Sequence, residues 1–213
     1  MHITYIGHSC FRIEKDGYRI VIDPYRNGMI PGLRDVDEEA EMVIASHGHE
    51  DHNAVGNVRI VEGGECPFKI SSIETFHDEC KGAKRGLNNI TILDDGVVRI
   101  AHFGDLGCDI ERELSPEELE QLMNLDYALI PIGGKYTIDG AEAISLMNLI
   151  KPACVIPMHF KSDKHGFGLS DIATRRGFTA LLPSVIEHKR SCLDTEDELL
   201  AVVNVLRPQN ANH

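Results

Sequence analysis

Apolar and polar residues alternate along the first half of the chain with the two-residue period of β-strands. Turn residues separate these segments, and Asp94-Asp95-Gly96 between two of them predicts a hairpin. Several of the segments lead directly into histidine or aspartate. The pattern predicts strands at residues 2–6, 11–14, 18–23, 42–46, 69–75, 90–93 and 97–103.

Helices and strands alternate in the second half. Ser115-Pro116-Glu117-Glu118 is typical of a capping box with proline at the first helical position, and Asp139 can cap a second helix. Strands followed by alternating helices and strands predict an α/β fold of two mixed sheets with helices outside. At 213 residues the chain fits a single domain, residues 1–213. The expected helices are 115–124, 139–150 and a weaker one after 170–171, and the expected strands are 127–132, 153–157 and 199–206.

Composition and charge narrow the class of protein. Hydrophobic residues make up 42% and charged residues 26% of the chain, as in ordinary globular proteins. No apolar run approaches the roughly 20 residues of a membrane span, and the N-terminus enters a strand pattern at once, without the features of a signal peptide. We therefore expect a cytoplasmic protein without membrane association. The net charge of −13 makes nucleic acid an unlikely partner, because binding to phosphates needs positive surface.

The highest density of chemically active side chains lies in His47-Gly48-His49-Glu50-Asp51-His52, directly after an apolar run. Histidine is the commonest metal ligand, and a carboxylate completes sites for divalent ions. In an extended segment His47 and His49 point to the same side, whereas Asp51 and His52 follow where the chain must turn. One short loop can therefore serve two metal ions. A surface cluster of polar residues is the weaker interpretation.

Three further residues, His77, Asp105 and His159, follow predicted strands. His102 competes with His77 for a ligand role. In an extended segment His102 and Asp105 point to opposite faces, so a metal-binding Asp105 makes His102 a core or supporting histidine. The six cysteines include no C-x-x-C pair and are expected to be reduced. Cys80, three residues after His77, stays open as an alternative ligand.

Residues 47–52 match the His-x-His-x-Asp-His signature of the metallo-β-lactamase superfamily, which this chain resembles. Segments 5–11, 22–25, 104–107 and 133–139 are similar to small stand-alone hydrolases of that superfamily. Ascorbate-lactone hydrolases and N-acyl-phosphatidylethanolamine phospholipases share parts of this pattern. The resemblance spans residues 3 to about 160. It implies a four-layered αββα sandwich, with metal ions at one edge of its two sheets.

The resemblance also implies a set of metal ligands. Nitrogen and oxygen ligands fit zinc as the best single candidate, and manganese, iron, nickel or cobalt are compatible. His49 occupies the position at which diiron oxygen reductases of this fold carry a carboxylate, which favours hydrolysis. One ion would take His47, His49 and His77, the other would take Asp51, His52 and His159, and Asp105 would bridge the two.

Two ions about 3.5–4 Å apart can share a hydroxide at neutral pH. Asp51 would orient this hydroxide and carry its proton. His8 would contact either the substrate or the metal-binding residues. Asp23 is either part of the site or a turn residue. The expected reaction is hydrolysis of an ester, lactone, amide, thioester or phosphodiester bond in a small-molecule substrate. Residues on loops after these strands are individually expected at the solvated surface, namely Lys135, Tyr136, Lys161 and His165.

Two alternative functions remain. One is a phosphodiesterase or nuclease, which the acidity and the lack of length for an additional nucleic-acid-binding domain disfavour. The other is a metal-binding scaffold protein without turnover. The presence of the whole expected ligand set disfavours a site that has lost its activity.

Overall fold

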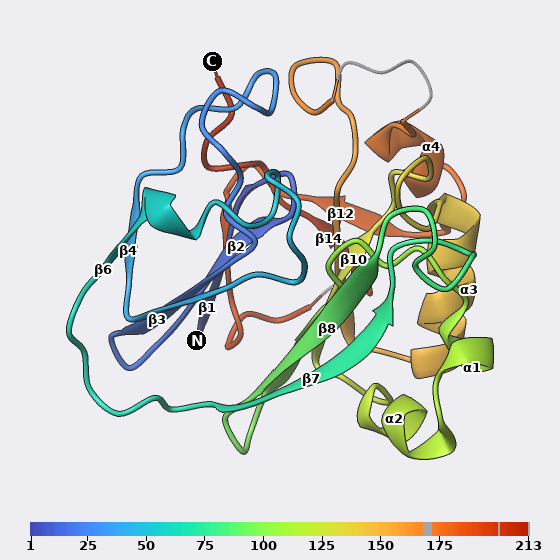
Figure 1. Ribbon diagram of the computed structural model, residues 1–213, viewed down its shortest axis with the longest axis horizontal. Coiled ribbons are helices and arrows are strands. Elements are labelled where there is room, and N and C mark those ends of the chain that lie inside the picture. The colour runs from blue at the N-terminus through green and yellow to red at the C-terminus, as the bar shows by residue number, and fades with distance from the viewer. Residues whose placement is uncertain (168–171, 200, 213) are drawn as a thin grey trace.

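The computed structural model describes residues 1–167, 172–199 and 201–212. Two β-sheets form its centre (Figure 1). The five-stranded sheet has the order β13 (Cys192–Asp194), β1 (His2–Gly7), β2 (Cys10–Lys15), β3 (Tyr18–Ile22), β5 (Met42–Ile44). The seven-stranded sheet has the order β12 (Val185–Glu187), β14 (Val203–Val205), β11 (Cys154–Met158), β10 (Tyr127–Pro131), β9 (Arg99–His102), β8 (Leu87–Asp94), β7 (Lys69–Phe76).

The main hydrophobic core includes residues of both sheets. In β3, Ile20 and Ile22 belong to this core, whereas Val21 between them belongs to a second cluster. The period-two alternation of the sequence therefore sorts the side chains of one strand into two apolar layers. Each fully buried side chain of this size contributes roughly 1.5–3 kcal/mol of hydrophobic stabilisation. The two sheets are thus held together mainly by apolar burial.

Helices α1 (Ile110–Glu113), α2 (Pro116–Gln121) and α3 (Gly140–Ile150) lie on the side of the seven-stranded sheet away from the other sheet (Figure 1). Asp139 and Ser115 form the capping boxes of α3 and α2 that the sequence predicts. Helix α3 buries Ala143, Leu146 and Ile150, which share one face at helical spacing. A short helix, α4 (Arg175–Thr179), follows further along the chain.

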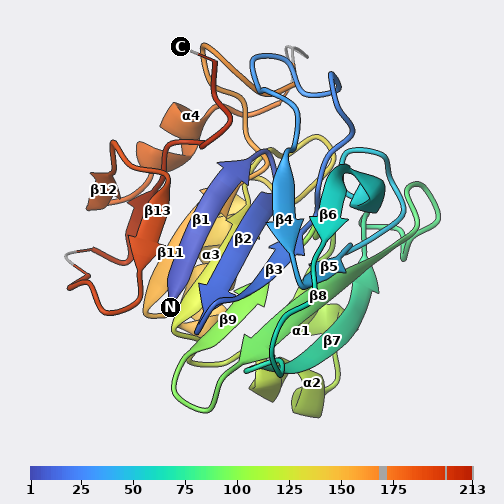
Figure 2. The same cartoon turned by 90° about the vertical axis from the view of Figure 1, so that its left-hand side faces the viewer.

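The outer layer of the five-stranded sheet differs from the expected helical one. It contains a two-stranded ribbon, β4 (Glu38–Ala40) with β6 (Val58–Ile60), and the 3-10 turn η1 (Val55–Asn57) (Figure 2). Ala40 and Val58 pack in the second apolar cluster beside Ile6. The α/β class with mixed sheets is confirmed, and a ribbon provides this outer layer.

Strand direction explains why one edge carries the polar residues. Strands β1, β3 and β5 run in the same direction, because β2 pairs antiparallel with β1 and β3, and β5 pairs parallel with β3. In the other sheet β7 and β9 both pair antiparallel with β8, and β10 and β11 run parallel to β9. The carboxyl ends of the strands that precede His8, Asp23, His77, Asp105 and His159 therefore reach one edge of each sheet.

Most predicted elements occur with shifted ends. Val97 was expected in a strand, but it is 81% exposed in the β8–β9 turn, and β9 starts at Arg99. Of the expected closing strand 199–206, residue 200 lies outside the described residues, and β14 covers Val203–Val205. The weak helix predicted after 170–171 corresponds to α4, although 168–171 lie outside the described residues. No helix in the described segments is long and apolar enough to cross a membrane.

An ion pair joins the two sheets at the edge away from the histidines. Lys15 at the end of β2 donates to Asp95 in the β8–β9 turn, with Nζ and Oδ2 2.6 Å apart. Burial disfavours the charged carboxylate, but hydrogen bonds from Lys15, Val98 and Val97 lower the pKa of Asp95 below its usual value. Because the folded-state pKa is depressed, this stabilisation is present above the unfolded-state pKa of about 4 and is lost as the pH falls through the folded-state pKa.

We therefore predict that Asp95→Asn lowers the free energy of unfolding by about 1–2 kcal/mol near pH 7. The difference from the unmodified protein should shrink as the pH falls toward about 3. Urea denaturation at the two pH values measures it. Asp16→Asn in the exposed β2–β3 turn is the matched control and should have little effect at either pH. A difference that does not change with pH would contradict the assigned role of the charge.

Candidate metal centre

The sequence-predicted ligands come together where the strands of both sheets end. His8 follows β1, His77 follows β7 and His159 follows β11. Asp105 comes three residues after the end of β9, and the His47–His52 loop follows β5. Segments far apart in the chain thus supply one cluster of imidazole and carboxylate groups, which is the arrangement that divalent metal ions require.

The first histidine cluster consists of His47, His49 and His77, and each of them can place one ligand atom within 4.8 Å of the others. His47 Nε2 and His49 Nδ1 are 3.1 Å apart. His77 is buried, His47 is half-buried and His49 is exposed. The first cluster can therefore surround a metal ion that stays accessible from the side of His49.

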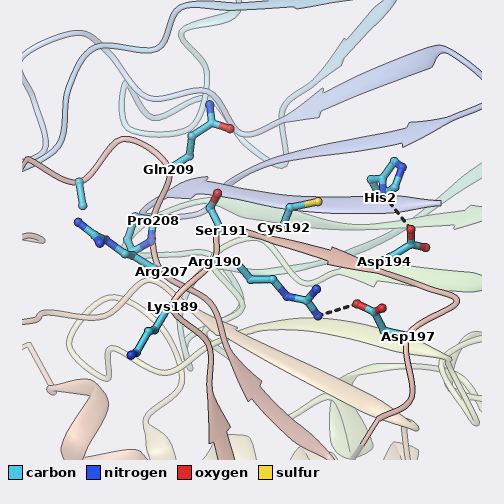
Figure 3. A pocket seen from close by; sticks show the side chains of 11 residues that line it. His2, Lys189, Arg190, Ser191, Cys192, Asp194, Asp197, Arg207, Pro208 and Gln209 are labelled. Carbon is cyan, nitrogen blue, oxygen red and sulfur yellow. Dashed lines mark hydrogen bonds and ion pairs between the residues drawn. The ribbon is translucent and has the colours of Figure 1, made fainter.

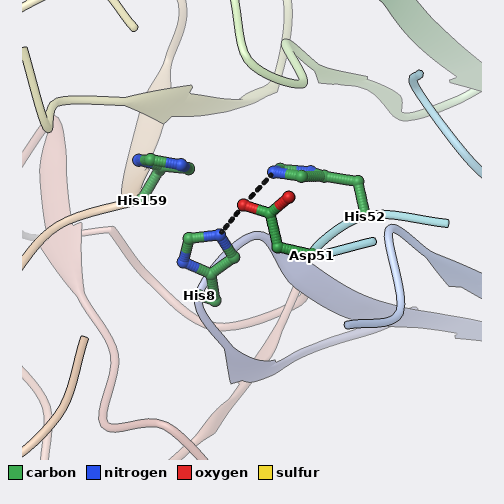
Figure 4. Close-up of side chains that lie close together, drawn as sticks. All are labelled: His8, Asp51, His52 and His159. Carbon is green, nitrogen blue, oxygen red and sulfur yellow. Dashed lines mark hydrogen bonds and ion pairs between the residues drawn. The ribbon is translucent and has the colours of Figure 1, made fainter. Parts of the chain in front are cut away.

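The second cluster consists of His8, Asp51, His52 and His159, with ligand atoms that also lie within 4.8 Å of one another (Figure 4). Asp51 Oδ2 lies 3.3 Å from His8 Nε2 and 3.5 Å from His52 Nε2. The ring of His8 also contacts the ring of His159, with centroids 4.3 Å apart. The structure thus adds His8 to the three residues that the resemblance assigns to a second ion.

Asp105 lies between the two clusters. Its Oδ2 is 3.1 Å from Nε2 of His77 in the first cluster, and 3.2 and 3.3 Å from Nε2 of His52 and His159 in the second. None of these three contacts has the geometry of a hydrogen bond, and Asp105 Oδ1 is likewise buried without a hydrogen-bond partner. Leaving such atoms unpaired costs about 1–3 kcal/mol each. Positive ions would satisfy the three nitrogens and Asp105 Oδ1, so the donor set fits metal binding.

Asp23 and Ser46 set the orientation of two candidate ligands. Asp23 is fully buried and accepts hydrogen bonds from His52 Nδ1 at 2.7 Å and from the backbone N–H and hydroxyl of Ser46 at 2.6 Å. His47 Nδ1 lies 2.9 Å from the same hydroxyl. With both Nδ1 atoms engaged in this way, Nε2 is the ring atom of His47 and of His52 that remains to bind a metal. Asp23 therefore supports the site and is more than a turn residue.

The backbone at the site is held in unusual conformations. His8, Asp23 and His159 have φ values of 58°, 52° and 50°, a left-handed region that costs side-chain-bearing residues energy. The backbone N–H of His159 donates to the carbonyl of His8 at 3.0 Å, which ties the end of β11 to the end of β1. Strain of this kind persists only where the surrounding structure fixes it, and it is common at functional sites.

Close packing places Asp105. Gly104 has a φ of 55°, and a Cβ there would come within 2.2 Å of Asn88 Oδ1. The same oxygen accepts the backbone N–H of Asp105 at 2.8 Å, and the amide of Asn88 donates to Thr75 and to the carbonyl of Phe103. Asn88 was not predicted as a supporting residue. It lies in a polar run at the start of β8, and its role depends on partners that only the sheet brings together.

The charges of the site suit metal ligands. Burial lowers the pKa of His47 to about 3, and burial together with nearby His159 lowers that of His8 to about 4, so these imidazoles are neutral. Burial opposes ionisation of Asp51, but His52 and His8 lower its pKa far below the usual range. For His52, burial opposes the charged form, but Asp105 and Asp23 raise the pKa well above its usual value, so a metal ion would have to displace a proton from this imidazole. The carboxylates thus favour positive charge beside the neutral imidazoles of His8 and His47.

Other candidates from the sequence lie apart from the clusters. His102 is buried, donates from Nε2 to the carbonyl of Ser9 at 2.8 Å and accepts the Gly104 N–H at Nδ1, so both of its ring nitrogens are engaged. Cys80 is exposed. His165 packs its ring near that of Phe160, and burial lowers its pKa to about 4. None of the three belongs to a metal-binding group among the described residues.

A cavity of about 540 Å³ opens onto the clusters. Cavities of this size hold small organic ligands. Tyr136 lines it, although the sequence alone favours a solvated surface position, and Met29, Arg85 and Phe167 were not predicted at all. The lining residues are Met29, His49, Asp51, His77, Arg85, Asp105, Tyr136 and Phe167.

A second cavity, of about 550 Å³, has a different character (Figure 3). Lys189, Arg190 and Arg207 are among the side chains that line it, together with His2 and Asp194. Arg190 is paired with Asp197 at 2.6 Å. No described residue that lines this cavity belongs to either cluster. Volume alone does not distinguish the two cavities, but only the first contains candidate metal ligands.

Comparison with known proteins agrees with this arrangement. A family model described as the beta-lactamase superfamily domain matches residues 2–159. A UPF0173 metal-dependent hydrolase of Desulforamulus reducens is 27% identical over 198 residues, which cover 76% of this chain and 85% of that protein. A second UPF0173 metal-dependent hydrolase, from Pelotomaculum thermopropionicum, is 31% identical over 200 residues. These residues cover 76% of this chain and 85% of that protein.

A solved structure extends the likeness to the fold. A candidate Zn-dependent hydrolase of the metallo-beta-lactamase superfamily from Thermotoga maritima matches with a TM-score of 0.68 and 27% identity. The match covers 96% of this chain and 97% of that one. The metallo-beta-lactamase fold and the superfamily resemblance are confirmed, with the β4–β6 ribbon in place of one expected outer layer of helices.

The different environments of His77 and His102 lead to a prediction. His77→Ala removes a nitrogen from the first cluster and should lower the amount of bound metal. His102→Ala should leave metal binding unchanged and lower the free energy of unfolding by about 1–3 kcal/mol, because the carbonyl of Ser9 loses its buried donor. Elemental analysis after metal reloading, combined with urea denaturation, measures both effects. Loss of metal in His102→Ala alone would show that the two assignments are reversed.

Proposed function

The chain belongs to the beta-lactamase superfamily domain family and, within it, to the UPF0173 metal-dependent hydrolases, and on that basis we propose that it is a dinuclear hydrolase of small polar molecules. The bond cleaved is an ester, lactone, amide or phosphodiester. The cavity of about 540 Å³ beside the clusters is of the size that a small-molecule substrate needs.

The position of Asp105 is the observation that carries this proposal. One carboxylate oxygen lies within 3.3 Å of imidazole nitrogens from both clusters, and these nitrogens have no hydrogen-bond partner. A shared carboxylate between two sets of ligands is suited to two ions held close together. His47, His49 and His77 would hold one ion, and Asp51, His52 and His159 the other.

Zinc is the metal we propose. Imidazole and carboxylate ligands without a thiolate suit zinc, while manganese, iron, nickel and cobalt are also compatible with them. The Thermotoga maritima protein, at 27% identity, bears a name that refers to zinc, which supports this choice. When bound, the ions supply an acidified water molecule and polarise the oxygen of the substrate.

Asp51 and His8 would act together to remove a proton from the attacking water. His8 is neutral at physiological pH, and the tautomer with its proton on Nε2 donates to Asp51 Oδ2 at 3.3 Å and holds that carboxylate in place. Asp51 lines the cavity, and with the ions bound its carboxylate would orient the attacking water and take up its proton. Asp51 has the catalytic role, and His8 positions it from the end of β1.

The number of ions tests the dinuclear arrangement. We expect protein purified without chelator and then reloaded to saturate at about two ions per chain, because two clusters share one bridging carboxylate. Elemental analysis gives the number, and a screen of the loaded protein against esters, lactones, amides and phosphodiesters tests turnover. Saturation at one ion would refute the dinuclear site. Two ions without turnover on any of these bonds would favour the scaffold alternative.

Asp51→Asn tests the proton-accepting role. The substitution keeps the shape but removes the charge, so the turnover number should fall by something on the order of 10²–10⁴-fold with metal in excess. Steady-state kinetics at confirmed metal content measures it. Glu50→Gln is the matched control, because Glu50 is exposed in the same loop and pairs with Arg26, and it should leave turnover unchanged. Near-normal turnover of Asp51→Asn with both ions bound would rule out this role.

A further inference from the structure

The loop after β7 is organised around one buried carboxylate. Asp78 follows His77 directly and is 1% exposed. Its Oδ1 accepts the backbone N–H groups of Cys80 and Gly82, and its Oδ2 accepts those of Lys84 and Arg85 at 2.9 and 2.7 Å. Four such bonds fix the backbone of residues 80–85 relative to a candidate metal ligand.

The same loop places Arg85 in the lining of the cavity. Arg85 donates from Nη2 to the carbonyl of Lys135 at 3.1 Å, and its Cζ lies 5.5 Å from the centre of the Tyr136 ring. Arg85 and Tyr136 both line the cavity with His49 and His77. The guanidinium is therefore held from two sides, by a carbonyl and by an aromatic face.

The positive charge of Arg85 has no acidic partner in the part of the chain that the structure describes. Among the described residues, no carboxylate lies within ion-pair distance of it, although most other arginines form such pairs. Lys84, the preceding residue, pairs with Glu79 and does not line the cavity. In a chain with a net charge of −13, an arginine that lines the cavity without an acidic partner is suited to receive an anion.

We propose that Arg85 binds an anionic group of the substrate, a carboxylate or a phosphate, and that the substrate is therefore an anionic small molecule. The planar guanidinium can donate two parallel hydrogen bonds to either group. Met29 and Phe167 add apolar lining to the same cavity, which suits an uncharged part of the molecule. The inference rests on the proposed function, because it takes the scissile bond to lie at the metal clusters beside Arg85.

Kinetics with a matched pair of substrates tests the proposal. Mono-4-nitrophenyl glutarate has a free carboxylate, and its methyl ester does not. In Arg85→Gln, kcat/KM for the anionic ester should fall on the order of 10–100-fold, as for loss of a charge-assisted hydrogen bond, while that for the neutral ester stays unchanged. Lys84→Gln removes the same charge from the same loop and should change neither. An equal fall for both esters in Arg85→Gln would overturn the anion-binding role.

Equilibrium binding separates this inference from the proposed function. Isothermal titration of metal-loaded protein with succinate and with inorganic phosphate measures anion affinity without turnover. Arg85→Gln should weaken binding of at least one of them on the order of 10–100-fold at equal metal content. The anion whose binding weakens identifies the type of group that Arg85 binds. Arg85→Lys should retain part of the affinity that Arg85→Gln loses.

If neither ester is cleaved but Arg85→Gln weakens anion binding, hydrolysis of such esters fails and the anion site stands. Equal affinities of Arg85→Gln and Lys84→Gln for both anions would show that the metal ions alone bind them, and this would overturn the inference. Melting temperatures of the variants show whether they are folded. Because Asp78 holds the backbone N–H groups rather than the side chains of the loop, both substitutions should leave the loop intact.

Discussion

The contact of one buried carboxylate with three unpaired imidazole nitrogens governs the rest of this structure. The Oδ2 atom of Asp105 lies 3.1–3.3 Å from Nε2 of His52, His77 and His159. Without ions, this arrangement leaves buried polar atoms unsatisfied and is unfavourable to folding. It persists because apolar burial between the two sheets fixes the strands from which these residues emerge. The stability of the scaffold thus maintains a site that would not form alone.

Residues around Asp105 and the histidines hold them in place through hydrogen bonds. Asp23 holds His52 and, through Ser46, His47, while Asn88 holds the backbone of Asp105. His8 and His159, which both belong to the second cluster, have left-handed backbone. Each of these features costs conformational energy or desolvation, and each is compensated by the packed core behind it. The same principle extends to Asp78, which fixes a loop at the rim of the cavity.

The sequence predicts the strands and the ligand loop well because both depend on local patterns. Period-two alternation locates the long strands, and strand parity places His102 away from Asp105, in agreement with its fully engaged ring. The β4–β6 ribbon was not predicted, since it is short and buries a charged residue, Glu38, which pairs with Arg12. Apolar Val97 suggests a strand but occupies an exposed turn.

The support residues were harder to predict for a different reason. Asn88 and Arg85 acquire their roles through partners distant in sequence, and no periodic pattern records such contacts. Asp23 left two interpretations open, because an aspartate before proline fits a turn as well as a site. The chemistry of the His47–His52 loop was evident from its residues, whereas the shape of the cavity depends on the packing of loops from both sheets.

The unequal burial of the two clusters has a consequence for the exchange of bound ions. His49 is exposed to solvent, whereas His52 and His159 are only 0% and 2% exposed. If two ions bind as proposed, the ion in the first cluster would exchange ligands with water through movement of the exposed His49 side chain. The ion in the second cluster would leave only when the buried His52 and His159 separate, and such local opening is slower and rarer. The two proposed positions would then differ in kinetic lability, and the fold would set the order in which a chelator empties them.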